Sequence, residues 1–186
     1  MTDPAWQADL ARYPRRAWLK EQSIPAIAVY RFGRRLDRRR DGPIKRLLTP
    51  AYWISFRAVE TITGISLPKA ARIGPGLKIW HFGNIFVHPD VEIGANCTLR
   101  QGVTIGNRRD GGPVPVLGDD VEIGAYAQIL GGVRVGCGAR IGAMAVVLID
   151  VPAGAVAVGN PARLIAAGSE AGDRPPRDRP DPERSH

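Results

Sequence analysis

The chain has 186 residues, which is enough for one domain with its own hydrophobic core and a smaller second element. Its 22 glycines and 6% aromatic content indicate a backbone with many tight corners and an aliphatic core. Two cysteines exclude a disulfide framework, residues 1–16 lack the apolar core of a signal peptide, and no apolar run is long enough to span a membrane. We therefore expect a cytoplasmic protein.

The positive charge is concentrated in the N-terminal third of the chain. Residues 1–60 carry 13 Lys and Arg against 6 Asp and Glu, whereas residues 61–168 carry 9 against 7. The densest basic run, at 34–46, fits a solvated helix face, an anionic membrane surface or lipid-linked substrate, or a nucleic acid. No DNA- or RNA-binding motif accompanies it, so we expect no nucleic-acid partner and leave open a peripheral contact with the inner face of the membrane.

Two helices are predicted in an N-terminal helical segment that spans residues 1–64. The first covers 23–36, with Ser23 as its N-cap and Pro25 in its first turn. The second covers 43–64 and ends at Gly64.

A six-residue repeat begins after these helices and predicts an all-β parallel β-helix over residues 65–166. Every sixth position from Val87 is aliphatic, with a break at Gly111, and glycine often follows the aliphatic residue. Neither an α-helix nor a plain strand produces this period, whereas three hexads make one coil of a β-helix. The predicted inward residues are Ile73, Ile79, Ile85, Val87, Ile93, Leu99, Ile105, Leu117, Ile123, Ile129, Val135, Ile141 and Val147.

The repeat is interrupted twice. Its register slips by two residues between Ile85 and Val87. Between Ile105 and Leu117, the sequence GNRRDGGPVPV predicts an external loop, where solenoids commonly place binding surfaces. The last segment, 167–186, is rich in Pro and charge and is predicted to be disordered.

Several motifs together resemble the serine acetyltransferase family of hexapeptide-repeat acyltransferases. They are RIGPGLKIWHFGNIFVH, TLRQGVTIGNRRDGG, DDVEIGAYAQILGGVRVGCGARIGAMAVVL and DVPAGAVAVGNPARLI, and the similarity covers about 23–166. The resemblance implies a left-handed coil, acetyl-CoA as the acyl donor without a metal, and a homotrimer or a dimer of trimers. It also implies that the donor lies in a groove between neighbouring solenoids.

The resemblance assigns the catalytic histidine of the family to His81. Histidine can take the proton of an acceptor hydroxyl as the oxygen attacks the thioester, and it can return that proton to the departing thiolate. The alternative is a structural or surface role. His88 follows the inward Val87 and should point outward, as a surface residue or a substrate contact. Zinc sites in hexapeptide trimers need three histidines, so we expect no metal here.

The acceptor side departs from the serine acetyltransferase pattern. Ser66 and Trp80 stand where the family has aspartates, and Pro113 and Val114 stand where it has an Arg-His pair. The pattern is closer to the exopolysaccharide and colanic acid acetyltransferases, which implies a sugar hydroxyl on a nucleotide- or lipid-linked carrier. Serine is the alternative acceptor. The candidate acceptor residues are Ser66, Trp80, Phe82, His88, Arg108 and Arg109.

Small residues in the repeats are candidates for the donor groove, because they leave room for a pantetheine arm. Arg163, near the end of the solenoid, could pair with a phosphate of CoA. The candidate donor residues are Gly106, Gly124, Ala125, Gly142, Ala143 and Arg163. Small residues also suit the corners of a non-catalytic trimeric solenoid, which is the alternative from another class. Outward Phe86, Tyr126 and Met144 should be covered by a neighbouring chain.

Overall fold

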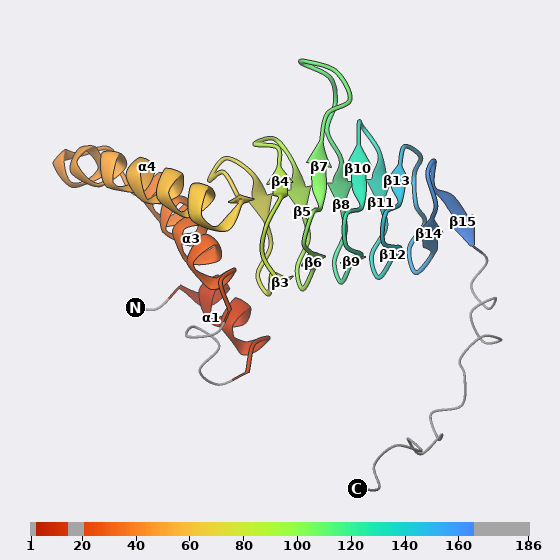
Figure 1. Ribbon diagram of the computed structural model, residues 1–186. Coiled ribbons are helices and arrows are strands. Elements are labelled where there is room, and N and C mark those ends of the chain that lie inside the picture. Colours follow the sequence, from red (N-terminus) through yellow and green to blue (C-terminus); the bar gives the residue numbers. More distant parts are fainter. Residues whose placement is uncertain (1–2, 15–20, 166–186) are drawn as a thin grey trace, which may run out of the picture.

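The computed structural model describes residues 3–14 and 21–165, and Figure 1 shows helices at one end of a long β-solenoid. The described helices are α1 (Pro4–Ala11), α3 (Ile24–Arg38) and α4 (Pro43–Thr63). The solenoid begins directly afterwards, at Ile65. Residues 166–186, which contain the predicted disordered segment, lie outside the described residues.

Three parallel sheets form the faces of the solenoid, and the chain visits them in turn. Sheet A contains β1 (Ile65–Ser66), β4 (Ile85–Val87), β7 (Thr104–Gly106), β10 (Gln128–Leu130) and β13 (Val146–Val147). Sheet B contains β2 (Arg72–Ile73), β5 (Glu92–Ile93), β8 (Val116–Leu117) and β11 (Arg134–Val135). Sheet C contains β3 (Lys78–Trp80), β6 (Thr98–Arg100), β9 (Glu122–Ile123), β12 (Arg140–Ile141), β14 (Val156–Val158) and β15 (Arg163–Ile165), of which only β15 runs antiparallel to its neighbour.

The core is the predicted aliphatic stack. All thirteen predicted inward residues are buried, and those of one sheet pair coil upon coil, as Ile73, Ile93 and Leu117 do. Each coil therefore buries its aliphatic residues against the next, which makes stability approximately a sum over neighbouring coils. The predicted parallel β-helix is confirmed.

The register slip lies in the corner that contains His81. Trp80 pairs with Arg100 and Phe86 pairs with Thr104, so five residues (81–85) lie opposite three (101–103). Ile85 and Val87 then both point inward from β4. The His81 corner is thus two residues longer than the corner stacked on it.

The predicted external loop is confirmed as residues 107–115, between β7 and β8. The equivalent connection in the next coil, between β10 and β11, has only residues 131–133. Figure 1 shows the loop projecting far beyond the other corners.

Both predicted helices are confirmed, but Ser23 does not cap α3 with its side chain. Its hydroxyl instead donates to the carbonyl oxygen of Ile79 in the solenoid, at 3.1 Å. Gly64 ends α4 as predicted, in the left-handed region with φ 65°. Helix α1 was not predicted from the sequence.

Side chains from the helical segment satisfy the open backbone edge of the first coil. The Tyr30 hydroxyl donates to the carbonyl of Ala71 and accepts from the amide of Ile73, both at 2.9 Å. The Tyr13 hydroxyl accepts from the amide of Ile79 at 2.8 Å. An unpaired edge would otherwise be a template for another strand.

A buried ion pair completes this cap. Arg31 and Asp9 meet at 2.7 Å, and both side chains are almost fully buried. Arg31 also donates to the carbonyls of Ile73 and Gly74, while Asp9 accepts from the amide of Leu77. Because both charges have several partners, the pair fixes how α1 and α3 sit on the solenoid.

Candidate active site

Three ladders of corners run along the solenoid, one between each pair of sheets. The C–A edge contains the corners that lead from sheet C to sheet A, and it begins with the His81 corner. Backbone hydrogen bonds stack these corners: Gly102 donates to Gly83, Tyr126 to Gln101, and Met144 to Ala125. Residues that are far apart in the sequence therefore form one continuous edge.

His81 lies exposed at the start of the C–A edge, immediately after β3. Its backbone is left-handed, with φ 65°, but Tyr126 and Met144 on the same edge have φ 59° and 62°. The conformation is thus the ordinary corner geometry of this solenoid and no sign of special strain. The ring of Trp80 lies 6.5 Å away, centroid to centroid.

The His81 ring makes no hydrogen bond to the residues that the structure describes. Ser66 lies in β1, opposite Phe86 of β4, and the described contacts do not join it to His81. The ring therefore has both nitrogens available to a substrate. None of the described residues supplies a carboxylate that would fix the tautomer of this ring, which is the usual device for a catalytic histidine.

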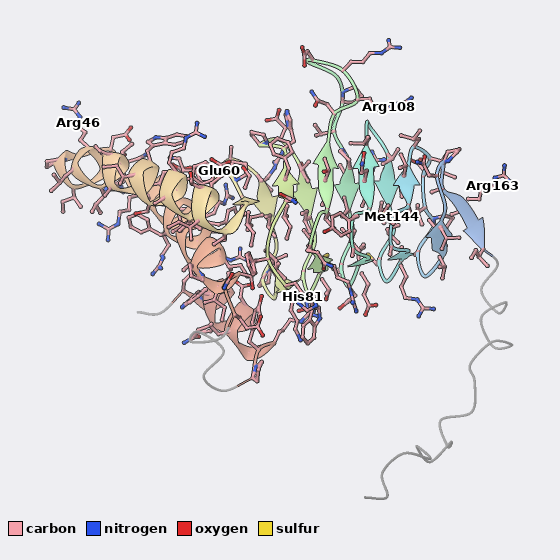
Figure 2. The ribbon with its side chains drawn as sticks, in the orientation of Figure 1. Arg46, Glu60, His81, Arg108, Met144 and Arg163 are labelled. Carbon is pink, nitrogen blue, oxygen red and sulfur yellow. The ribbon has the colours of Figure 1, made fainter. Side chains whose placement is uncertain are left out.

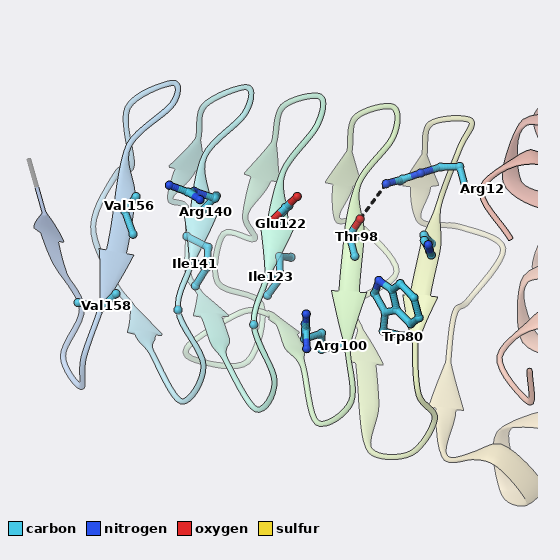
Figure 3. A pocket seen from close by; sticks show the side chains of 13 residues that line it. Arg12, Trp80, Thr98, Arg100, Glu122, Ile123, Arg140, Ile141, Val156 and Val158 are labelled. Atoms are coloured by element: carbon cyan, nitrogen blue, oxygen red, sulfur yellow. Dashed lines mark hydrogen bonds between the residues drawn. The ribbon is translucent and has the colours of Figure 1, made fainter. Parts of the chain in front are cut away.

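A groove of about 460 Å³ runs along the outer face of sheet C, beside this edge (Figure 3). Trp80 lies at one end of the groove, and Gly124 and Gly142 line it where sheet C meets the C–A edge. His81 follows Trp80, so the candidate base lies where the groove opens onto the edge. The groove is lined by Arg12, Lys78, Trp80, Thr98, Arg100, Glu122, Ile123, Gly124, Arg140, Ile141, Gly142, Val156 and Val158.

Four cationic side chains and one acid line the groove. The Lys78 ammonium lies 4.0 Å from the centroid of the Trp80 ring, which holds both side chains at the His81 end. Arg12 donates to the Asn96 carbonyl at 2.6 Å and to the Thr98 hydroxyl at 3.0 Å, so it mainly joins α1 to the solenoid. Its charge nevertheless adds to those of Lys78, Arg100 and Arg140, which makes the groove suited to a long anionic ligand.

Only part of this groove is predicted from the sequence. Lys78, Arg100 and Arg140 were missed, although each is in β3, β6 or β12 next to an inward aliphatic residue. Arranging the hexads by coil would have aligned these positions. Arg12 carried no such signal, because α1 reaches the groove only through the folded cap.

The small donor candidates divide between two edges. Gly124, Ala125, Gly142 and Ala143 lie together on the C–A edge, whereas Gly106 ends β7 at the other side of sheet A. A Cβ atom on Gly124 would lie 2.5 Å from the amide nitrogen of Ala143, and one on Gly142 would lie 2.8 Å from Val158 Cγ1. Coil stacking alone therefore requires these two glycines.

The remaining acceptor candidates, apart from Phe82, lie on the A–B edge, across sheet A from His81. His88 begins one corner there, and Arg108 and Arg109 belong to the external loop. Figure 2 shows Arg108 and His81 on opposite sides of the solenoid. His88 Nδ1 accepts from the amide of Asp90 at 3.2 Å, so one ring nitrogen stabilises its own turn. A single chain thus brings His81 together with Trp80 and Phe82 but not with these residues.

Arg163, the last donor candidate, lies in β15 and pairs with Val158 at the far end of sheet C. Its side chain is exposed, and its pairing partner Val158 lines the end of the groove. A phosphate bound there would lie five strands along sheet C from β3, the strand that leads into His81.

The B–C edge carries both cysteines. Cys97 is buried and donates to the carbonyl of Gly118, and burial raises the pKa of its thiol from 9.0 to about 11. Cys137 is exposed, and the two thiols are not bonded. Within the described residues, no group of three His, Cys, Asp or Glu side chains could hold a metal ion.

Known proteins share the repeat and resemble most of this chain. The bacterial transferase hexapeptide (six repeats) family matches residues 115–148. Serine acetyltransferase from Helicobacter pylori (strain ATCC 700392 / 26695) is 38% identical over 144 residues, which cover 76% of this chain and 80% of that protein.

Solved structures agree with this relationship. Neisseria gonorrhoeae serine acetyltransferase in complex with serine has a TM-score of 0.73 and 30% identity, covering 87% of this chain and 68% of that one. The soybean serine acetyltransferase apoenzyme has a TM-score of 0.75 and 33% identity, covering 88% and 70%. This chain is an acetyltransferase with a hexapeptide-repeat solenoid, and it belongs to the serine acetyltransferase family.

Proposed function

We propose that the protein transfers an acetyl group from acetyl-CoA to the hydroxyl of L-serine, with His81 as the general base. The observation that carries this proposal is the enlarged corner that presents His81 at the mouth of the cationic groove. The family relationship supports the donor and the acceptor, since relatives are named serine acetyltransferase and solved neighbours hold serine or CoA.

The chemistry follows from the free ring of His81. A ring nitrogen takes the hydroxyl proton while the oxygen attacks the thioester carbonyl carbon. The tetrahedral intermediate then collapses, the C–S bond breaks, and the imidazolium protonates the departing thiolate. Such acid–base catalysis commonly contributes about 10²–10⁴-fold. Without an acidic partner, the tautomer of His81 depends on the bound substrates.

The groove on sheet C is the proposed donor site. Its length allows an extended pantetheine arm to run from His81 past Gly124 and Gly142. Arg100, Arg140 and, further along, Arg163 are positioned to pair with phosphate groups of the donor. Ala125 and Ala143 have small side chains, which leave space for the arm along the C–A edge. Gly106 lies on the other side of sheet A, so it cannot contribute within one chain.

A trimer is the proposed active form. Phe86, Tyr126 and Met144 are exposed along sheet A and the C–A edge, and an apolar surface of this kind is suited to a neighbouring solenoid. A neighbour would also supply the second wall of the groove. His88, Arg108 and Arg109 could then reach the acceptor only from the adjacent subunit.

A sugar hydroxyl is the second candidate acceptor. Trp80 and Phe82 are 40% and 47% exposed beside His81, and aromatic faces of this kind can stack on a sugar ring. Trp80 also stands beside His81 where the family has an aspartate, so it removes a carboxylate that could pair with the ammonium group of serine. The named relatives nevertheless favour serine over the sugar that the sequence pattern suggested.

Thiol release from acetyl-CoA tests both acceptors in one assay. We expect L-serine to stimulate release in the wild-type protein, and we expect no stimulation by L-alanine, which has the same charges but no hydroxyl. Release with a nucleotide-linked sugar but not with serine would establish the second candidate. Calorimetry with CoA tests the donor site separately, and no binding at millimolar CoA would favour a non-catalytic solenoid.

A further inference from the structure

Helix α4 carries an exposed apolar stripe that the acetyl-transfer site does not use. The helix buries Tyr52 and Phe56 against α3 and turns a second apolar face to solvent. The four large stripe residues are 59–78% exposed, and the spacing of three or four residues places the whole stripe on one side of the helix. The apolar stripe consists of Ile44, Leu47, Ala51, Ile54, Ala58 and Ile62.

A strongly basic turn adjoins the first residues of this stripe. Residues 38–46, which form this basic turn, contain five Lys and Arg against one Asp, a net charge of +4. A hollow of about 270 Å³ lies in the turn, where Arg39, Arg40 and Lys45 surround the exposed Ile44. Figure 1 shows that the turn is the end of the α3–α4 hairpin furthest from the solenoid.

An anionic lipid surface satisfies both features at once. Phosphate head groups can occupy the basic turn, while the apolar stripe enters the boundary with the acyl chains. None of the described helices is long and apolar enough to cross a membrane.

A second copy of α4 fits less well. The helix carries Lys45, Arg46 and Arg57 against a single acid, Glu60, so two such helices would bring like charges together. We therefore propose that the apolar stripe and the basic turn dock the protein on an anionic membrane surface. This contact is independent of the proposed acetyl transfer, because neither feature touches the groove or His81.

Vesicle sedimentation tests the proposal directly with the full chain. We expect the protein to sediment with vesicles of phosphatidylglycerol and phosphatidylcholine, to remain in solution with phosphatidylcholine alone, and to detach as salt is raised. The double variant Leu47→Asp/Ile54→Asp should bind at least about ten-fold more weakly, because it places charges in the stripe. Its control is Ile149→Asp, which places a charge at an exposed apolar site on the solenoid instead (45% exposed, against 76% for Leu47 and 71% for Ile54).

The charge contribution has its own pair of variants. Arg39→Ser/Arg40→Ser should lower the vesicle affinity about thirty-fold, while Arg134→Ser/Arg163→Ser, with the same change in net charge, should lower it far less. Equal losses in the two pairs would mean that net charge alone attracts the protein, which overturns the proposed surface. Absence of vesicle binding by the wild-type protein would also overturn it. A third contrary outcome is a stripe variant that binds vesicles as well as wild type but has a lower mass by light scattering, because the stripe would then join copies of the chain. Thermal melts confirm that each variant is folded.

Discussion

The His81 corner and the His88 corner lie at the two ends of β4, and they use the same residue type differently. His81 lies in a corner that is two residues longer than the one stacked on it, and its ring has no hydrogen-bond partner among the described residues. His88 lies in a compact corner, and its Nδ1 is occupied by the amide of Asp90. The difference shows that a histidine becomes a candidate base when the backbone around it leaves its ring free.

The largest effect that this comparison predicts is on the turnover of His81→Ala. We expect kcat to fall by at least about 10²-fold, because none of the other described groups beside the groove mouth can take the hydroxyl proton. Steady-state kinetics with saturating acetyl-CoA would measure the loss. An equal fall in kcat for His88→Ala would contradict the distinction between the two corners.

Cys97, on the B–C edge of the solenoid, leads to a prediction about stability. Because the thiol of Cys97 has its pKa raised to about 11 by burial, it ionises first in the unfolded chain. Above pH about 9 the unfolded state therefore binds fewer protons, and the free energy of unfolding should fall by about 2 kcal/mol by pH 11.

Urea unfolding across this pH range measures how the free energy of unfolding depends on pH. Cys97→Ala should remove most of this dependence between pH 9 and 11. Tyr13, Tyr30 and Tyr52, whose hydroxyl pKa values are also raised by burial, should still destabilise the fold at higher pH. Identical slopes in the wild-type protein and the variant would contradict the assignment to Cys97.

A smaller effect is expected along the groove that starts at the His81 corner. Arg100→Ala should raise the KM for acetyl-CoA about ten-fold with little change in kcat, because a charge-assisted hydrogen bond to the donor is lost in both ground and transition states. Arg134→Ala on sheet B is the matched control and should leave KM unchanged. A fall in kcat alone would place Arg100 in the chemical step instead.

The smallest effect is expected at the other corner. His88→Ala should leave kcat within about two-fold of wild type and lower the free energy of unfolding by about 1 kcal/mol, since it removes the acceptor for the Asp90 amide. Parallel kinetics and urea unfolding would separate these two readouts. A large rise in the KM for the acceptor would show that this corner reaches the acceptor in an adjacent subunit.

The sequence predicted the solenoid well because each hexad is a local signal. Inward positions such as Ile93 and Leu117 repeat in a fixed register, and the slip near Ile85 correctly marked the unusual corner. The cationic groove was harder to predict, because Lys78, Arg100 and Arg140 meet only when successive coils are stacked. Their side chains point outward, where the repeat places few demands on residue type.

The packing of the N-terminal helical segment on the first coil was harder to predict from the sequence. Ser23 was expected to cap α3, but its hydroxyl bonds to Ile79 because the open edge of the first coil offers an unsatisfied carbonyl. Asp9 and Arg31 likewise find partners only in the folded solenoid. Local patterns identify a helix, whereas contacts of this range depend on the packed structure.

The bonds made by Arg12 also constrain the order of folding during synthesis. Its guanidinium binds groups 64 to 86 residues further along the chain, from Gly76 to Thr98. Coils of the solenoid can be added one after another as they leave the ribosome, because Ile73 pairs with Ile93 only twenty residues later. The N-terminal segment emerges first but cannot complete its docking until the second coil exists. The start of this chain is therefore among the last parts of the helical cap to be fixed in place.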